Sequence, residues 1–167
     1  WRRLLRNRMA TIGGCVVLFF VCVAVFAPLI APYYPNKPDF ISRMQGPSRE
    51  HWLGTDTLGR DMLSRIIYGS RYSLLAGIVS VTIAAFAGTL LGLVSGYYGG
   101  WVDMVIMRFM DMLLAFPGIL LAIAIISVLG RGLFNAMVSV GLYSVPSFAR
   151  VVRSRVLSLR EQEFVES

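Results

Sequence analysis

The sequence predicts an all-α integral membrane protein, and its composition and charge pattern carry that prediction. Hydrophobic residues make up 56% of the 167 residues and charged residues only 15%, against roughly 25% charged residues in a soluble domain. Several apolar stretches are long enough to cross a bilayer as helices. Most arginines flank these stretches, where positive charge fixes the orientation of membrane helices. The net charge of +7 therefore indicates membrane topology rather than nucleic-acid binding.

The first predicted membrane helix covers residues 9–31 and follows a tail at residues 1–8 that carries four arginines. The segment from Met9 to Ile30 contains no charged residue, and about 20 apolar residues suffice to cross the hydrocarbon core. A cleaved signal peptide would have a shorter apolar region and an A-x-A-like site, which the sequence lacks. Because arginines are retained on the cytoplasmic side, we expect the N-terminus to be cytoplasmic.

Residues 32–71 are predicted to form an outer loop that contains an amphipathic helix at about residues 57–69. Prolines and glycines mark the first part of the loop as irregular. Asp56 can cap the helix, and Asp61 and Arg65 are spaced to form an i,i+4 pair on it. The apolar face of the helix consists of Leu58, Met62, Leu63, Ile66 and Ile67. A short helix with this pattern is expected to lie in the membrane interface.

The second predicted span, residues 72–98, carries a stripe of small residues. The stripe consists of Ser80, Ala84, Gly88, Gly92 and Gly96. Four residues advance a helix by about 400°, so these residues lie on one slowly turning face. Glycine is common in membrane helices, but this abundance does not explain five small residues in register. Small residues let membrane helices approach closely, and we expect the stripe to pack against another helix.

The third predicted span covers residues 104–129 and follows a cytoplasmic turn at residues 99–103. Asp103 is placed to cap this helix. Arg108 and Asp111 fall in its first turns, and a charge at the middle of the bilayer costs about 3 kcal/mol on insertion scales. We therefore expect both residues to lie near the cytoplasmic interface and to pair with each other at i,i+3.

Proline and glycine predict how the chain continues. Pro117 removes one backbone hydrogen bond and is expected to kink the third span. Residues 130–132 form an outer turn, and residues 133–149 form a fourth, shorter span that Pro146 breaks. Four spans place both ends of the chain on the cytoplasmic side.

The C-terminal stretch, residues 150–167, is rich in charge and is predicted to be helical. Its apolar face continues from the fourth span and consists of Phe148, Val152, Val156 and Leu159. One interpretation is a basic helix that lies along the membrane surface. The other is a docking helix that transmits force from a soluble partner, with Phe164 as an apolar anchor and Glu166 as a charge that sets register.

No residue pattern indicates catalysis, a cofactor or a metal. His51 is the single histidine, and no metal-ligand spacing accompanies it. Cys15 and Cys22 are separated by roughly 10 Å of helical rise, too far for a disulfide, and we interpret them as packing residues. The sequence contains no phosphate-binding loop and no nucleophile–base pair. We expect no catalytic, cofactor-binding or metal-binding residue in this chain.

Two groups of residues resemble the motifs of one transporter family. They are Gly54-Thr55-Asp56, Gly59-Arg60-Asp61, Ser64-Arg65, Gly69, Arg71 and Ser73-Leu74 before the second span, and Met107-Arg108, Asp111 and Phe116-Pro117 in the third. In these motifs the chain resembles permease subunits of bacterial peptide and nickel ATP-binding-cassette importers, above all the dipeptide, oligopeptide and glutathione subgroup. Residues 163–167 resemble the opening of that family's Glu-Ala-Ala signature, with Glu166 as the glutamate and Ser167 in place of the first alanine.

The resemblance implies a type I ABC importer permease fold of six membrane helices, of which this chain would hold the first four. We expect a fragment cut at both ends, since the chain starts without methionine and stops within a helical pattern. The implied partners are a homologous second permease subunit, two ABC ATPase subunits, an extracytoplasmic substrate-binding protein and the lipid bilayer of the bacterial inner membrane, with no nucleic acid. The residues expected to couple to the ATPase are Arg160, Glu161, Glu163, Phe164, Glu166 and Ser167.

The predicted function is therefore transport of peptides of the dipeptide, oligopeptide or glutathione class by a subunit that is not itself an enzyme. The alternatives are a nickel or other small-solute permease of the same family, a channel or secondary transporter, and a membrane scaffold. A channel or secondary transporter favours ionisable residues at mid-span, and these spans are almost free of charge there. Substrate-dependent ATP turnover distinguishes a permease from a scaffold. No residue indicates which peptide or solute is carried.

Overall fold

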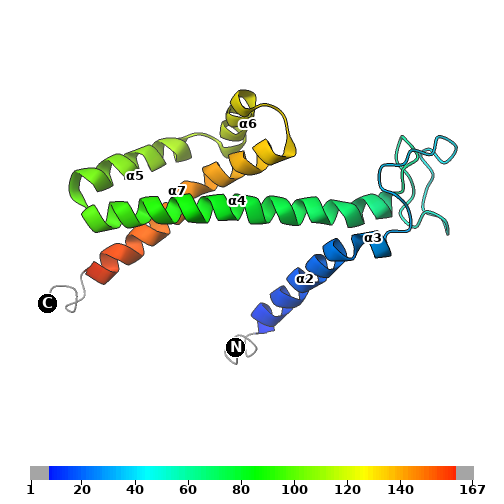
Figure 1. Cartoon of the computed structure of the whole chain (residues 1–167), viewed down its shortest axis with the longest axis horizontal. Coiled ribbons are helices and arrows are strands. Elements are labelled where there is room, and N and C mark those ends of the chain that lie inside the picture. Colours follow the sequence, from blue (N-terminus) through cyan, green and yellow to red (C-terminus); the bar gives the residue numbers. More distant parts are fainter. Residues whose placement is uncertain (1–7, 161–167) are drawn as a thin grey trace. The chain divides into compact units, whose positions relative to one another are not determined.

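The computed structural model describes residues 8–160, and every regular element in that range is a helix apart from one isolated β-bridge (Figure 1). The helices are α2 (Arg8–Val25), α3 (Ala27–Ile30), α4 (Met62–Tyr98), α5 (Gly100–Ala115), α6 (Gly118–Leu129) and α7 (Leu133–Arg160). The all-helical prediction is confirmed for these residues. The chain forms two compact units, Trp1–Leu75 and Ala76–Ser167.

In the first unit, the first predicted span consists of two helices, α2 and α3, separated at Phe26. Pro28 has no N–H and cannot donate to the carbonyl of Ala24, four residues earlier. The side chain of Arg71, on α4, takes this place. Its Nε donates to the Ala24 oxygen at 2.6 Å, and a terminal nitrogen donates to the Val25 oxygen at 3.1 Å. The proline thus ends α2, and the freed carbonyls fasten α2 to α4.

The loop between α3 and α4 folds around a tight turn at residues 54–61, where we predicted the start of a helix. The predicted start of the 57–69 helix is wrong, because α4 begins at Met62. Asp56 accepts hydrogen bonds from two backbone N–H groups of the turn, at 2.9 Å each. Gly59 has a φ of +76°, a left-handed conformation that no α-helix contains. Together these features close a turn that delays the helix by more than one helical turn.

α4 then continues without a break over its 37 residues, so most of the predicted amphipathic helix and the second predicted span, residues 72–98, belong to one helix. Oδ2 of Asp61 accepts from the backbone N–H of Ser64 at 2.8 Å and from its hydroxyl at 2.7 Å, as an N-cap residue does. The predicted Asp61–Arg65 pair is wrong, because Arg65 donates to Asp56 at 2.8 Å. The cap turns the Asp61 carboxylate toward the start of the helix, and the turn brings Asp56 within reach of Arg65.

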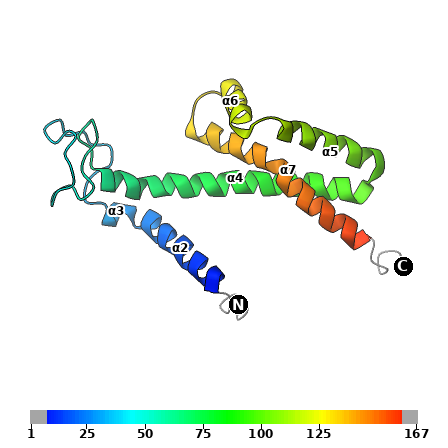
Figure 2. The same cartoon turned by 180° about the vertical axis from the view of Figure 1, so that it is seen from behind.

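In the second unit, α5 and α6 form a bent pair, and α7 packs along the C-terminal part of α4 (Figure 2). The bend of 98° falls at Phe116-Pro117, where the sequence predicts a kink. A residue before proline avoids the helical conformation, and Phe116 is extended at φ −81° and ψ 136°. Gly130 ends α6 with a φ of +91°. Asn135 closes the following turn by donating to the carbonyls of Leu129 and Gly130.

α7 is one helix of 28 residues, and the prediction that Pro146 breaks it is wrong. The φ angle of proline is itself compatible with a helix, and the main costs are one lost hydrogen bond and a local clash. Pro146 is fully buried. Its neighbours Val145 and Ala149 pack with Met110 of α5 in the core of this unit, and this packing holds the helix together. The predicted fourth span and the start of the C-terminal stretch therefore form one continuous rod.

Within the described residues, α2 and α4 are each long and apolar enough to cross a membrane. The bent α5–α6 pair provides a third candidate if it is counted as one span. α7 is not in this set, since serines, Asn135 and the arginines of its second half dilute its apolar character. The predicted fourth span at residues 133–149 stays a prediction.

Candidate functional site

The small residues of α4 lie against α7. At Gly88, a Cβ atom would lie 2.5 Å from Cβ of Phe148 and 2.8 Å from the carbonyl oxygen of Val145. At Gly92, it would lie 2.5 Å from the carbonyl oxygen of Ala149. These distances are shorter than van der Waals contact, so the two backbones approach this closely because α4 has no side chain there.

The rest of the stripe contacts α7 on either side of these glycines. Ser80 donates its hydroxyl to the carbonyl of Met137 at 2.8 Å, which gives a polar group a partner inside the protein. Ala84 is fully buried. A Cβ at Gly96 would lie 2.7 Å from Cβ of Val156. Ser80 and the three glycines of the stripe therefore contact α7, and Ala84, which lies between them on α4, is buried.

Asp103, in the first turn of α5, is held by residues from two other helices. Arg153 of α7 donates through Nε and a terminal nitrogen to the two carboxylate oxygens, at 2.5 Å each. Ser95 of α4 donates its hydroxyl to the same carboxylate. The prediction that Asp103 caps the helix is wrong, because Gly99 is the N-cap of α5 and Asp103 lies within the first helical turn. The carboxylate instead connects α4, α5 and α7.

Two more arginines of α7 have specific partners. Arg160 donates to two carbonyl oxygens in the last turn of α4, at 3.1 and 3.0 Å, which satisfies acceptors that the helix itself leaves open. Arg150 forms an ion pair with Asp111 at 2.6 Å. The predicted pairing of Asp111 with Arg108 on the same helix is therefore wrong. The packing of α7 brings Arg150 to Asp111 from 39 positions away along the chain.

In the loop between α3 and α4, Asp56 binds two arginines. Arg60 donates from Nε at 2.8 Å, and Arg65 donates from a terminal nitrogen, also at 2.8 Å. The hydrogen bond from Arg60 is the main reason why the pKa of Asp56 falls from its ordinary value of 3.8 to about 2. The carboxylate is therefore charged at neutral pH, and it ties the turn to the first residues of α4.

A chain of buried and partly buried hydrogen bonds joins the loop to the start of α4. Nδ1 of His51 lies 2.9 Å from Oδ1 of Asp61, and Ser64 donates to the other oxygen of that carboxylate. The hydroxyl oxygen of Ser64 also accepts from the backbone N–H of Tyr33 at 3.1 Å. Burial alone would raise the pKa of Asp61, but the hydrogen bonds from Ser64 and His51 outweigh it and lower that pKa. The segment that follows α3 is thus fixed to α4.

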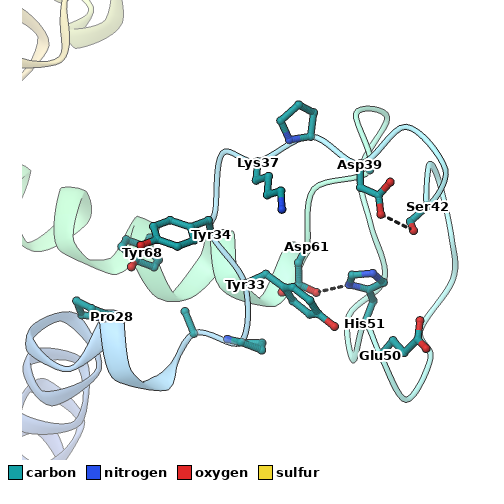
Figure 3. A pocket seen from close by; sticks show the side chains of 14 residues that line it. Pro28, Tyr33, Tyr34, Lys37, Asp39, Ser42, Glu50, His51, Asp61 and Tyr68 are labelled. Atoms are coloured by element: carbon teal, nitrogen blue, oxygen red, sulfur yellow. Dashed lines mark hydrogen bonds and ion pairs between the residues drawn. The ribbon is translucent and has the colours of Figure 1, made fainter.

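A cavity of about 770 Å³ lies beside this chain of hydrogen bonds. Figure 3 shows the side chains that line it. The ring of Tyr33 packs on His51, with their centroids 4.9 Å apart. The charged or titratable side chains in the lining are Tyr33, Tyr34, Lys37, Asp39, Glu50, His51, Asp61 and Tyr68. A lining with carboxylates, an amine and aromatic rings can accept and donate hydrogen bonds to a polar ligand. In the described part of the chain, no group of three or more His, Cys, Asp or Glu could hold a metal ion.

The residues that the sequence predicted as sites fall in different places. The motif residues Gly54, Asp56, Gly59, Arg60, Asp61 and Arg65 lie together in the turn and at the start of α4. In the second unit, Arg108 and Asp111 lie in α5, and Pro117 is the N-cap residue of α6. Arg160 ends α7. The other predicted coupling residues, Glu161, Glu163, Phe164, Glu166 and Ser167, lie outside the described residues.

Sequence reasoning missed the contacts of His51, Arg71 and Arg153, which hold these sites together. Their partners lie 10, 47 and 50 positions away along the chain, whereas helical spacing predicts only contacts at i+3 and i+4. For Arg71 and Arg153, the sequence did contain one signal that a partner exists. A charged residue near an apolar segment normally has a partner inside the protein, so each needed an acceptor.

Two family models match the chain. Residues 1–47 match the N-terminal TM domain of oligopeptide transport permease C, and residues 88–167 match the binding-protein-dependent transport system inner membrane component. The motif residues at the start of α4 fall between the two matches.

Curated relatives cover the whole chain. It is 49% identical over 167 residues to the dipeptide transport system permease protein DppC of Alkalihalophilus pseudofirmus, a match that covers 99% of this chain and 54% of the relative. It is 48% identical over 168 residues to the glutathione transport system permease protein GsiD of Pectobacterium atrosepticum, a match that covers 100% of this chain and 56% of the relative. For GsiD of Escherichia coli O157:H7 the identity is 50% over 168 residues, and the match covers 100% of this chain and 55% of the relative.

The chain spans about half the length of the curated relatives it matches. The two family matches, the all-helical fold and an identity near 50% along the chain agree with one another. The chain belongs to the family of inner membrane components of binding-protein-dependent transport systems.

Proposed function

We propose that this chain is the N-terminal part of a permease subunit that carries peptides of the dipeptide, oligopeptide or glutathione class across the bacterial inner membrane. The observation that carries the proposal is the identity of 48 to 50% to dipeptide and glutathione permeases along the chain. The proposed architecture is the type I importer fold, with the first four of six membrane helices present here.

The proposed topology has a cytoplasmic N-terminus, spans at residues 9–31, 72–98, 104–129 and 133–149, and residues 32–71 outside. Support comes from the second unit, where Arg153 and Arg160 of α7 contact α5 and the last turn of α4. The end of α7 and the α4–α5 turn are therefore at the same side of the membrane. Because arginines collect on the cytoplasmic side, this side is the cytoplasm.

The subunit is a transport component, and ATP hydrolysis belongs to its partners. In the proposed complex it pairs with a homologous permease subunit and two ABC ATPase subunits, and an extracytoplasmic binding protein delivers the substrate. The continuous rod of α7 supports a coupling role for the stretch that begins at Arg160, because a rod carries displacement from its end to the helices packed along it.

The test is transport by the complete importer in proteoliposomes, with the full-length subunit, its second permease, the ATPase and the binding protein. Labelled dipeptide, labelled glutathione and nickel ions are offered separately, with ATP or with a non-hydrolysable analogue. ATP-dependent uptake of a peptide, lost when the binding protein is omitted, supports the proposal. Uptake of nickel alone indicates the small-solute alternative, and uptake without the ATPase indicates a channel.

A further inference from the structure

Two arginines on one side of α7, near its C-terminal end, form polar contacts with residues where α4 ends and α5 begins. Arg153 and Arg160 are seven residues apart, which is almost two full turns, so both side chains leave the same side of α7. Arg153 reaches Asp103 at the start of α5, and Arg160 reaches the carbonyls of Gly96 and Tyr97 at the end of α4. One edge of α7 therefore holds both helices where the chain turns between them.

The Arg153–Asp103 contact fixes orientation as well as distance. Two parallel N–H donors meet two carboxylate oxygens, the bidentate geometry in which a guanidinium is held most firmly. The Arg153 and Asp103 side chains are 33% and 17% exposed, whereas those of Arg150 and Asp111 are 51% and 53% exposed. Water and salt weaken the exposed pair more. The hydroxyl of Ser95 further fixes Asp103 to α4.

Beside this ion pair, close apolar packing prevents α7 from sliding along α4. A Cβ at Gly92 would lie 2.8 Å from Cβ of Val152, and a Cβ at Gly96 would lie 2.7 Å from Cβ of Val156. Val152 and Val156 flank Arg153 on α7, so the apolar contact and the ion pair act on the same turns. Interfaces packed this closely shift as a unit and do not deform continuously.

We propose that Asp103 and Arg153 form a positioning pair that makes α4, α5 and the end of α7 move as one body when the ATPase displaces the chain beyond Arg160. This inference rests on the proposed function, and it assigns the coupling of ATP hydrolysis to transport to a pair within the permease subunit. Without the pair, α7 can still insert and pack on α4 through Val152 and Val156, but a displacement of its end is no longer carried to α5.

The experiment measures substrate uptake per ATP hydrolysed by the complete importer in proteoliposomes. The variants are Asp103→Asn, Arg153→Gln and the swapped pair Asp103→Arg/Arg153→Asp. The matched control is Arg155→Gln, which removes an exposed arginine of α7 that has no ion pair among residues 8–160. We expect each single variant to assemble and hydrolyse ATP while its uptake per ATP falls roughly two- to thirtyfold, the range that changes within coupled networks produce. The swapped pair recovers part of that loss, and the control matches the wild type.

Wild-type uptake per ATP in both single variants overturns the proposal, and so does a swapped pair that performs no better than the singles. Failure of Arg153→Gln to assemble overturns it too, because the pair then serves stability alone. The proposed function fails separately: in that case the wild-type importer itself shows no ATP-dependent peptide uptake.

Discussion

Nδ1 of His51 lies 2.9 Å from Oδ1 of Asp61, and this contact fastens the loop between α3 and α4 to the residue directly before α4. Both side chains are buried. The other oxygen of Asp61 caps α4 through Ser64, whose hydroxyl holds the backbone of Tyr33. One carboxylate thus joins three segments of the first unit, and its removal tests the whole arrangement.

The first prediction is that Asp61→Ala loosens the loop. The change deletes the cap of α4, worth about 1 kcal/mol, and leaves His51 buried without its partner, at roughly 1–3 kcal/mol. Trypsin should then cut the loop at Arg43 and Arg49 faster in the purified full-length subunit. Asp39→Ala is the control, because Asp39 is exposed and, among the described residues, its carboxylate accepts hydrogen bonds only from Ile41 and Ser42. Equal cleavage rates for the two variants would contradict the prediction.

The second prediction concerns acid. The pKa of Asp56 is about 2 in the folded protein and ordinarily 3.8. A carboxyl group whose pKa is lowered by folding contributes stability that is fully present above its unfolded pKa and is lost as pH falls through its folded pKa. Asp56→Asn lacks this contribution at every pH. The difference in hydrogen-exchange protection of the loop between wild type and variant should therefore be constant above about pH 4 and shrink toward pH 2. A difference that persists unchanged at pH 2 would show that the charge is not its source.

The third prediction concerns the contact between α4 and α7. Gly92→Leu places a side chain where a single Cβ would already lie 2.5 Å from the Ala149 carbonyl oxygen, and forced overpacking costs roughly 1–3 kcal/mol. The yield of assembled complex should fall well below that of Val94→Leu. Val94 is the matched control, since it is two residues away on α4 and 40% exposed. Equal yields would mean that this contact does not support assembly.

The fourth prediction tests topology with single cysteines at Ser48 and Ser158, in a full-length subunit without Cys15 and Cys22. Both positions are exposed. In intact cells without an outer barrier, an impermeant maleimide should label position 48 and leave position 158 unlabelled until the cells are opened. Labelling of position 158 alone would invert the proposed orientation.

The fifth prediction concerns the C-terminal stretch, as read from the sequence. Phe164→Ala in the full-length subunit should weaken copurification of the ATPase by roughly 1–3 kcal/mol, as expected for a central apolar anchor. Glu166→Lys should separate ATP turnover from uptake while membrane insertion stays normal. If both variants keep wild-type copurification and uptake, the stretch is a membrane-surface helix and not a docking helix.

The sequence by itself determined what local chemistry controls. The membrane class follows from composition, and the breaks at Pro117 and Gly130 follow from the backbone chemistry of proline and glycine. The register of the small-residue stripe follows from helical periodicity, which any single helix carries in its own sequence. These properties need no knowledge of neighbouring helices, and in each case the structure agrees with the local reasoning.

Only the tertiary structure decided which charges pair and where two helices begin and continue. We predicted Asp61 with Arg65 and Asp111 with Arg108, but the structure pairs Asp61 with His51 and Asp111 with Arg150. A pair within one helix is worth only about 0.2–0.5 kcal/mol, so a partner that packing brings closer replaces it.

The same reason applies to helix boundaries. The residue pattern at Asp56 fits a helix cap and a turn equally well. The turn forms because Arg60 and Arg65 bind the Asp56 carboxylate, the first from the turn and the second from α4. Pro146 locally predicts a break, but burial of α7 against α4 and α5 keeps that helix whole. Long-range packing outweighs local preference at these positions because a local preference is a single contribution of at most about 3 kcal/mol, whereas several tertiary contacts act together on the same residues.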